Sequence, residues 1–254
     1  MSSSAPALPW LSPHQAFPPA HQAWQAGSAA PGLLAAGGVL DVATLCQAYS
    51  QGIFPWFSDD QPILWWSPDP RMVLRPSQLR MHRSLKQTVQ HFRRSPECEI
   101  RIDSAFEQVI AACASSRRAG QSGTWIVAPM IDAYLALHHA GFAHSVETWI
   151  DGQLCGGLYC VAIGKAVFGE SMFTHVSNGS KIALAALVGL CAHHGIAQID
   201  CQQNTRHLAF MGAAEVSRAD FLAEVSSAVS QTAPVWRFDP LYWQAILHSK
   251  QDLA

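Results

Sequence analysis

The stretch HSVETWIDGQLCGGLYCVAIGKAVFGESMF, residues 144–173, decides the fold. From His144 to Ile150 the side chains alternate with a period of two, as in a half-buried strand. Asp151-Gly152 follows and is a strong signal for a hairpin turn. Residues 153–163 and 166–173 then continue as a second and a third strand. The stretch therefore predicts three consecutive antiparallel strands.

The residues that follow this stretch predict the fold class. A helix is expected from Asn178 or Ser180 to about His194, then a short buried strand near 196–201 and a second helix near 218–229. Gly156-Gly157 in the second strand indicates a β-bulge. Three strands, a helix, a strand and a helix are typical of an α+β domain with a mixed sheet.

The residues before this stretch are less regular. Residues 1–30 are rich in Ala, Pro and Ser and carry no charge, so we expect an irregular N-terminal segment. Residues 31–78 are expected to form a small N-terminal domain, with a helix that Asp41 caps. Residues 79–254 form the predicted C-terminal domain, which begins with a basic helical segment at 79–118 and has a further helix over 129–140.

Charge is unevenly distributed along the chain. Only 13% of the 254 residues are charged and the net charge is -2, so no overall field indicates a nucleic-acid partner. Residues 71–118, however, hold ten Lys and Arg against four Asp and Glu. This segment fits either one face that binds an anionic polymer or an ordinary solvated helix surface. No run approaches the roughly 18 apolar residues of a membrane span.

Cysteine and histidine usage indicates the compartment and argues against a metal. The seven cysteines include no C-x-x-C pair. A signal peptide would begin with a basic region, whereas no Lys or Arg precedes Arg71. We therefore expect reduced thiols in a cytoplasmic protein. Several of the twelve histidines are adjacent pairs, which point in different directions on a helix, so no metal site is expected.

Polar residues at strand ends are the candidates for chemistry. Asp200 and Gln202 end the predicted short strand, and Glu170 lies near the end of the third strand. A carboxylate there is costly unless it is paired or functional. Asp200 is either functional or a helix cap, and Glu170 either functional or paired with Lys181. Cys201 reads as a small buried side chain rather than a nucleophile.

Tryptophans gather in the N-terminal half. Trp56, Trp65, Trp66 and Trp125 either line an apolar pocket or belong to the core. Because tryptophan is rarely fully buried and this region is rich in proline, the pattern favours a surface groove.

Seven stretches, in order and at near-family spacing, resemble the bacterial leucyl/phenylalanyl-tRNA–protein transferases. They cover about residues 31–222 and are Pro31-Gly-Leu-Leu-Ala35, Tyr49-Ser-Gln-Gly-Ile-Phe-Pro-Trp-Phe57, Trp65-Trp-Ser-Pro-Asp-Pro-Arg71, Gly123-Thr-Trp-Ile126, His144-Ser-Val-Glu147, Gly169-Glu-Ser-Met-Phe173 and Ile199-Asp-Cys-Gln202. One such motif is weak, whereas seven in order are specific.

The resemblance implies a fold and an activity. The family joins a small N-terminal domain to an acetyltransferase-like (GNAT) domain. It transfers leucine or phenylalanine, with methionine left open, from aminoacyl-tRNA to the N-terminal Arg or Lys of a protein, which then enters the N-degron route to degradation. No cofactor is implied, neither CoA nor a metal. The implied partners are Leu-tRNA, Phe-tRNA and the acceptor proteins, without a membrane, and we expect a monomer.

The resemblance also implies roles for single residues. Asp200 and Gln202 become the catalytic pair, and Glu170 lies in the active cleft, where it pairs with a cation of the acceptor. The implied aminoacyl and adenosine pocket consists of Trp56, Trp125, Leu158, Val167 and Leu187. The implied tRNA phosphate contacts are Arg80, Arg83, Lys86, Arg93 and Arg94.

Four positions depart from the family pattern. Leu158 stands where a member of the family has Met, and Val167 and Leu187 stand where it has Phe. These exchanges keep the pocket apolar but alter its shape. Phe210 stands where a small Ser is common, in an expected loop near Gln202.

The implied reaction is aminolysis of an ester, which needs orientation of the amine more than a strong base. We expect Asp200 to polarise Gln202, whose oxygen accepts a proton from the amine. Asp200 itself or a tRNA hydroxyl is the alternative proton acceptor.

Two rival functions are a non-catalytic tRNA- or peptide-binding module and a CoA-dependent acetyltransferase. The second lacks a Gly-rich pyrophosphate loop, since residues 175–181 contain one glycine.

Overall fold

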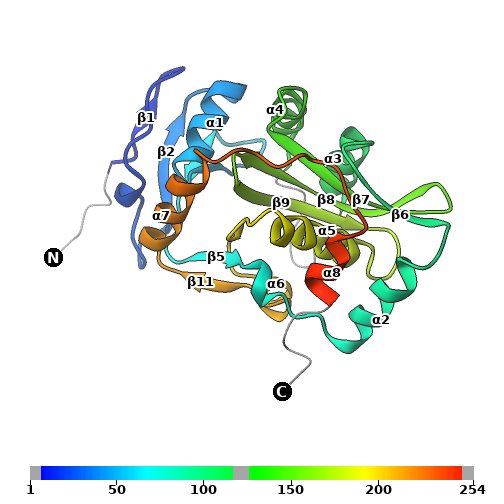
Figure 1. Cartoon of the computed structure of the whole chain (residues 1–254). Coiled ribbons are helices and arrows are strands. Elements are labelled where there is room, and N and C mark those ends of the chain that lie inside the picture. Colours follow the sequence, from blue (N-terminus) through cyan, green and yellow to red (C-terminus); the bar gives the residue numbers. More distant parts are fainter. Residues whose placement is uncertain (1–6, 117–125, 248–254) are drawn as a thin grey trace.

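The computed structural model describes residues 7–116 and 126–247. A small sheet lies beside a larger one in Figure 1. The small sheet has the strand order β1-β2-β4-β3, with β1 parallel to β2 and the other pairs antiparallel. Its strands are β1 (Trp10–Leu11), β2 (Leu33–Gly37), β3 (Phe54–Pro55) and β4 (Leu64–Trp66).

The larger sheet has seven strands in the order β11-β5-β10-β9-β8-β7-β6. All neighbouring pairs are antiparallel except β9 and β10, which run parallel. Its strands are β5 (Arg71–Leu74), β6 (Cys98–Ile102), β7 (Ala143–Ile150), β8 (Gln153–Ile163), β9 (Ala166–Thr174), β10 (Ile199–Gln202) and β11 (Ala214–Val216). The predicted mixed sheet and α+β class are confirmed.

Helices cover both faces of this sheet (Figure 1). One face packs against α1 (Val42–Ser50), α3 (Phe106–Ser115), α4 (Ala128–His139) and α7 (Arg218–Ala228). The other packs against α2 (Arg83–Phe92), α5 (Gly179–His193) and α8 (Tyr242–Leu247). The remaining helices are the short α6 (Arg206–Phe210) and the 3-10 turns η1 (Ala20–Gln22) and η2 (Pro76–Gln78). None of the helices within the described residues is long and apolar enough to cross a bilayer.

The strongly patterned elements were predicted correctly. The three antiparallel strands, the long helix and the short strand after it are present as β7, β8, β9, α5 and β10. Asp41 accepts a hydrogen bond from Thr44 N at 2.8 Å and caps α1 as expected. Asn178 does not cap α5 with its side chain, because its left-handed backbone (φ 67°) turns the amide toward Thr88 on α2.

The predicted basic helical segment at 79–118 is only partly helical. It holds α2 and α3, but β6 lies between them and pairs with β7. In addition, β5 belongs to the larger sheet, although the expected small domain extended to residue 78. One apolar cluster runs from Leu11 in the small sheet to Phe173 in the large one, so both sheets share core packing. The acetyltransferase-like assignment remains a prediction.

Candidate active site

A cavity of about 430 Å³ opens between β9 and β10. The two strands pair at Ile199–Val167 and Asp200–Phe168, and beyond these pairs residues of both strands line the cavity. Leu184 and Leu187 of α5 contribute apolar lining. Further lining comes from Phe54 in β3 and Trp56 just after it, and from Thr205, His207 and Leu208 around α6. The cavity is large enough for an amino-acid side chain and part of a nucleoside.

Two β-bulges direct polar side chains into this cavity. On β9, Tyr159 pairs with Ser171 and Cys160 with Gly169, so Glu170 is the extra residue of a bulge. On β10 the register shifts between Asp200 and Gln202, and Gln202 takes a left-handed conformation with φ 61°. Such a φ is costly for a residue other than glycine and is frequent at functional sites. Both bulges therefore interrupt the alternation and aim Glu170 and Gln202 at each other.

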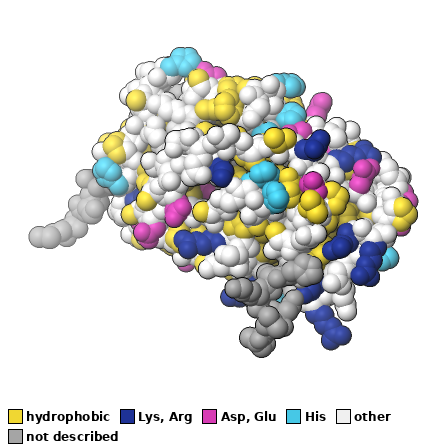
Figure 2. All heavy atoms as spheres, in the orientation of Figure 1, with side chains coloured by type: hydrophobic (Ala, Val, Ile, Leu, Met, Phe, Trp, Pro, Cys, Tyr) yellow, Lys and Arg dark blue, Asp and Glu magenta, His cyan; other side chains and the backbone are white. Residues whose placement is uncertain are grey.

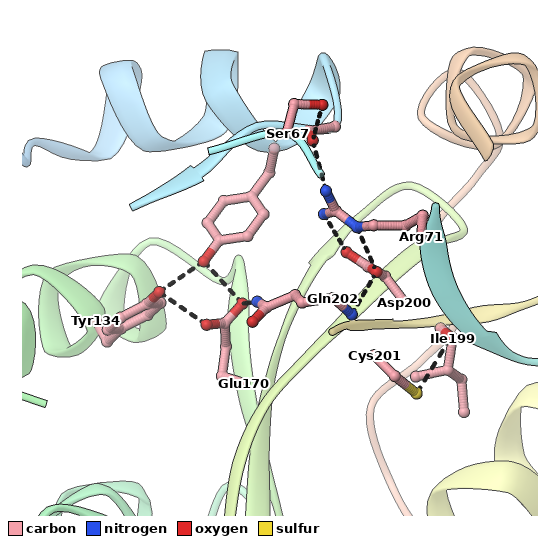
Figure 3. A network of polar contacts seen from close by, with 10 residues as sticks. Ser67, Arg71, Tyr134, Glu170, Ile199, Asp200, Cys201 and Gln202 are labelled. Carbon is pink, nitrogen blue, oxygen red and sulfur yellow. Dashed lines mark hydrogen bonds and ion pairs between the residues drawn. The ribbon is translucent and has the colours of Figure 1, made fainter. Parts of the chain in front are cut away.

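Glu170 lies at the centre of a hydrogen-bond network (Figure 3). Tyr49 donates to its Oε1 at 2.8 Å, and Tyr134 donates to its Oε2 at 3.0 Å. Gln202 Nε2 also donates to Oε1, at 3.0 Å. The two tyrosine hydroxyls are 2.6 Å apart. Glu170 is thus held by hydroxyl and amide donors from α1, α4 and β10, rather than by the alternative partner Lys181.

Burial dominates the protonation of Glu170. Removal from water raises its pKa from the ordinary 4.5 to about 7, although its hydrogen bonds with Tyr49, Tyr134 and Gln202 lower the pKa. Burial and the nearby carboxylate raise the pKa of both tyrosines well above their usual range. The tyrosines therefore remain hydrogen-bond donors, while Glu170 changes charge near neutral pH. A carboxyl group of this kind in a cavity is a candidate functional group.

Asp200 is buried and paired with Arg71 (Figure 3). Arg71 Nε donates to Oδ1 at 2.8 Å and Nη2 to Oδ2 at 2.6 Å, a bidentate ion pair. Oδ1 also accepts the main-chain N–H of Gln202 at 2.8 Å. Asp200 does not line the cavity between β9 and β10. Its contact with Gln202 is to the backbone, so it fixes the strained turn and does not touch the side-chain amide.

The predicted pocket residues are brought together only in part. Trp56, Leu158 and Leu187 line the cavity. Val167 does not line it and lies in the core beside α5, because it precedes the β9 bulge. Trp125 lies outside the described residues.

Sequence reasoning missed three partners of the site. Tyr49, Tyr134 and Arg71 lie 121, 36 and 129 residues from the side chains that they contact. Tyr49 and Arg71 belong to stretches quoted for the family resemblance, and Tyr134 to a predicted helix, but no pattern linked them to Glu170 or Asp200. Buried polar side chains on otherwise apolar elements were the available signal.

The basic residues lie on α2 and in the segments on either side of it. Arg80, Arg83, Arg93 and Arg94 are exposed and Lys86 is half-buried, while Leu85, Val89 and Phe92 bury the opposite face of α2. In Figure 2, Lys and Arg side chains gather over the position of α2 in Figure 1, at the lower right. A helix with one buried and one basic face is available to an anionic partner.

Other candidate chemistry is weaker. Cys201 lines the cavity, but burial raises the pKa of its thiol well above the usual range, which keeps it protonated and unreactive. All seven cysteines lie in the described part of the chain, and none of them forms a disulfide. Within residues 7–116 and 126–247, no cluster of three or more His, Cys, Asp or Glu side chains is placed to hold a metal ion.

An α+β chain with an apolar cavity, edged by one carboxyl and one amide, fits an enzyme that holds an apolar group beside a polar reaction centre. The family profile described as leucyl/phenylalanyl-tRNA protein transferase matches residues 73–226, and the profile of that family's N-terminal domain matches residues 38–69.

Curated relatives agree over nearly the whole chain. A leucyl/phenylalanyl-tRNA–protein transferase of Albidiferax ferrireducens is 64% identical over 247 residues, 97% of either chain. Those of Polaromonas sp. and Burkholderia pseudomallei are 62% and 53% identical, over 96% and 91% of either chain. The chain therefore belongs to the leucyl/phenylalanyl-tRNA–protein transferase family.

Proposed function

We propose that this chain transfers leucine or phenylalanine from an aminoacyl-tRNA to the N-terminal Arg or Lys of acceptor proteins, which marks them for degradation by the N-degron route. The observation that carries the proposal is the cavity of about 430 Å³, largely apolar, with Glu170 and Gln202 at its edge. The relatives named leucyl/phenylalanyl-tRNA–protein transferase, one of them 64% identical, support it. Methionine is a further candidate for the transferred residue.

The reaction is the attack of an α-amino group on an aminoacyl ester. A C–N bond forms, the ester C–O bond breaks, and the amine proton passes to the leaving tRNA hydroxyl. The amine needs no strong base, because its pKa of about 7.7–8.0 leaves part of it neutral near pH 7. Gln202 Nε2 is engaged by Glu170 at 3.0 Å, which leaves Oε1 to accept a hydrogen bond from the amine. Gln202 thus orients the nucleophile.

Asp200 and Glu170 have different roles in this proposal. Asp200 is a positioning residue, since Arg71 occupies both its oxygens and its Oδ1 holds the Gln202 backbone. Glu170 faces the cavity and, when ionised, attracts the ammonium or the cationic side chain of the acceptor. An N-terminal Arg or Lys supplies both charges.

The apolar lining selects the transferred side chain. Trp56, Leu158 and Leu187 offer a surface for an unbranched or γ-branched side chain such as leucine, phenylalanine or methionine. Trp125 is proposed to contribute to the adenosine site, although it lies outside the described residues. Val167 affects the pocket only through its packing in the core beside α5.

The proposed partners need no cofactor. The ester of aminoacyl-tRNA is already activated, so neither CoA nor a metal is required. Packing at the start of α5 supports this. A Cβ at Gly156 would lie 2.8 Å from Gly179 Cα, so the two segments leave little space for a pyrophosphate.

The tRNA phosphates are proposed to be held by the basic residues Arg80, Arg83, Lys86, Arg93 and Arg94. We propose a cytoplasmic monomer, and seven cysteines without a disulfide fit a reducing compartment.

The direct test uses Leu-tRNA and a peptide with N-terminal Arg. Mass spectrometry should show a peptide heavier by one leucyl residue. The same peptide with an acetylated N-terminus, which lacks the nucleophile, and a peptide with N-terminal Gly, which lacks the cationic side chain, should remain unmodified. Failure to modify the Arg peptide with any of Leu-, Phe- or Met-tRNA would contradict the proposal.

A further inference from the structure

The last residue of α6 is an exposed aromatic side chain. Phe210 is 54% exposed, and its ring stacks on His82 with 3.9 Å between centroids and 20° between planes. Since this stack covers one ring face, the exposed fraction belongs largely to the other. A single exposed apolar residue is ordinary, so its surroundings decide whether it has a role.

The ring pair is held rigidly. Arg80 N donates to Met211 O at 2.9 Å, and His82 Nε2 donates to Phe210 O at 3.2 Å. Gly212, with φ 103°, allows the two segments to meet, because a Cβ there would lie 2.1 Å from Gln78 O. The stack is therefore a fixed surface, which costs little conformational entropy when a flat ligand binds.

Cations flank the ring and the cavity is close by. Arg206 and Phe210 are four residues apart on α6, so they share its exposed face. Arg80 and Arg83 are exposed next to His82. Leu208, two residues before Phe210 on the same short helix, lines the cavity. Phe210 thus lies between the cavity rim and the basic face of α2.

We infer that Phe210, supported by His82, is a stacking surface for an unpaired base in the 3′ end of the donor tRNA, next to the nucleoside that carries the amino acid. Single-stranded nucleic acids are commonly bound by aromatic rings that stack on bases, beside basic residues that contact phosphates. Stacking on an aromatic ring accepts any base, so it suits a 3′ end that all tRNAs share. The inference rests on the proposed function, which supplies the donor.

Charge favours the donor over the acceptor as the occupant. Arg206 lies one helical turn before Phe210, and Arg80 and Arg83 lie within two residues of His82. Their positive charge attracts a polyanion and repels an acceptor whose N-terminal residue is cationic. In a nucleotide chain, the base can stack on the ring while the flanking phosphates contact the arginines.

The test compares Phe210 variants on donors of increasing length. Phe210→Ala should raise the KM for Leu-tRNA, and for a leucylated trinucleotide with the tRNA 3′ sequence, about tenfold, in line with the loss of one stacked base. The KM for leucyl-adenosine should not change, since this donor has no further base. Phe210→Trp should retain wild-type values, and Phe210→Leu, which is apolar but not aromatic, should behave like Phe210→Ala. Trp10→Ala, at a comparably exposed aromatic on β1, is the matched control and should have no effect.

Binding of uncharged tRNA, measured by fluorescence anisotropy, separates this inference from the proposed function. About tenfold weaker binding by Phe210→Ala supports the stacking surface even if no transfer occurs. Normal transfer by the wild type with unchanged donor KM and tRNA affinity in Phe210→Ala overturns the inference and leaves the proposed function intact. A raised KM for the acceptor peptide instead of the donor also overturns it, because the surface would then bind the acceptor.

Discussion

At the scale of single residues, Gln202 combines a strained backbone with a hydrogen bond to the part-buried carboxyl group of Glu170. If its amide orients the amine, Gln202→Ala should lower kcat about 10²-fold or more and leave tRNA affinity nearly unchanged. Single-turnover assays and tRNA binding check this. Asn204→Ala, at an exposed amide that bonds Glu215, is the control and should keep full activity. A wild-type kcat in Gln202→Ala would remove this residue from the mechanism.

Glu170 should make stability depend on pH. The folded protein binds its proton more tightly than the unfolded chain, with a pKa of about 7 against 4.5. Its contribution to stability is therefore fully present below pH 4.5 and is lost as the pH rises to about 7. In Glu170→Gln this contribution is absent. Between pH 5 and pH 8, the unfolding free energy of the variant should thus rise relative to wild type by about 2–3 kcal/mol.

Urea unfolding of both proteins at each pH measures this difference, and other titrating groups cancel in the comparison. A difference that stays constant across the range would mean that Glu170 does not titrate there.

The sequence revealed some of these residues and not others. Gln202, Asp200 and Glu170 were found because polar residues at the ends of apolar strands stand out. The contacts of Tyr49, Tyr134 and Arg71 depend on how distant elements pack, which one sequence does not specify. The ion pair with Arg71 also changes the interpretation of Asp200, from a group that polarises Gln202 or accepts the proton itself to a group that fixes the backbone.

At the scale of elements, length and periodicity determined what was predictable. The long strand β7 alternates clearly, and the Asp151-Gly152 turn links it to the long strands β8 and β9. In contrast, β6 and β11 have only five and three residues and lie at the edges of the sheet. The β8 bulge at Cys155 was expected from the adjacent Gly156-Gly157. The two bulges that build the site involve Glu170 and Gln202, which are not glycines, so no local signal indicated them.

The basic face of α2 should give tRNA binding a salt dependence. Replacing Arg80, Arg83 and Lys86 together with Ala removes three cations on α2 and just before it. If each contacts a phosphate, the log–log slope of affinity against salt should flatten by about two to three, since each contact contributes about 0.7–0.9. Affinity should fall alike for all tRNAs, because phosphates carry no sequence information.

Titrations from low to high salt measure this slope. Lys165→Ala, in the β8–β9 turn before the start of β9, should change it little. An unchanged affinity and slope in the triple variant would identify the basic face of α2 as an ordinary solvated surface.

At the scale of the whole molecule, Arg71 joins the two sheets and α7. It forms an ion pair with Asp200 on β10 and donates a hydrogen bond to Gly52 O at 3.1 Å. Its guanidinium also lies over two aromatic rings, 4.8 Å from the centroid of Phe54 and 4.5 Å from that of Phe221. Phe54 belongs to the small sheet and Phe221 to α7. Local geometry at Gln202 therefore depends on how these parts of the protein pack together.

Arg71→Met should reveal this dependence. It leaves the Asp200 carboxylate buried without its partner, which should lower the unfolding free energy by about 3–5 kcal/mol. Adding Asp200→Asn removes the stranded charge but keeps an oxygen that can accept the Gln202 N–H. The double variant should regain much of the stability and, if Asp200 only positions the backbone, most of the kcat. Urea unfolding and single-turnover transfer measure the two quantities. A double variant that is stable but remains about 10²-fold slow would instead show that the Asp200 charge takes part in proton transfer.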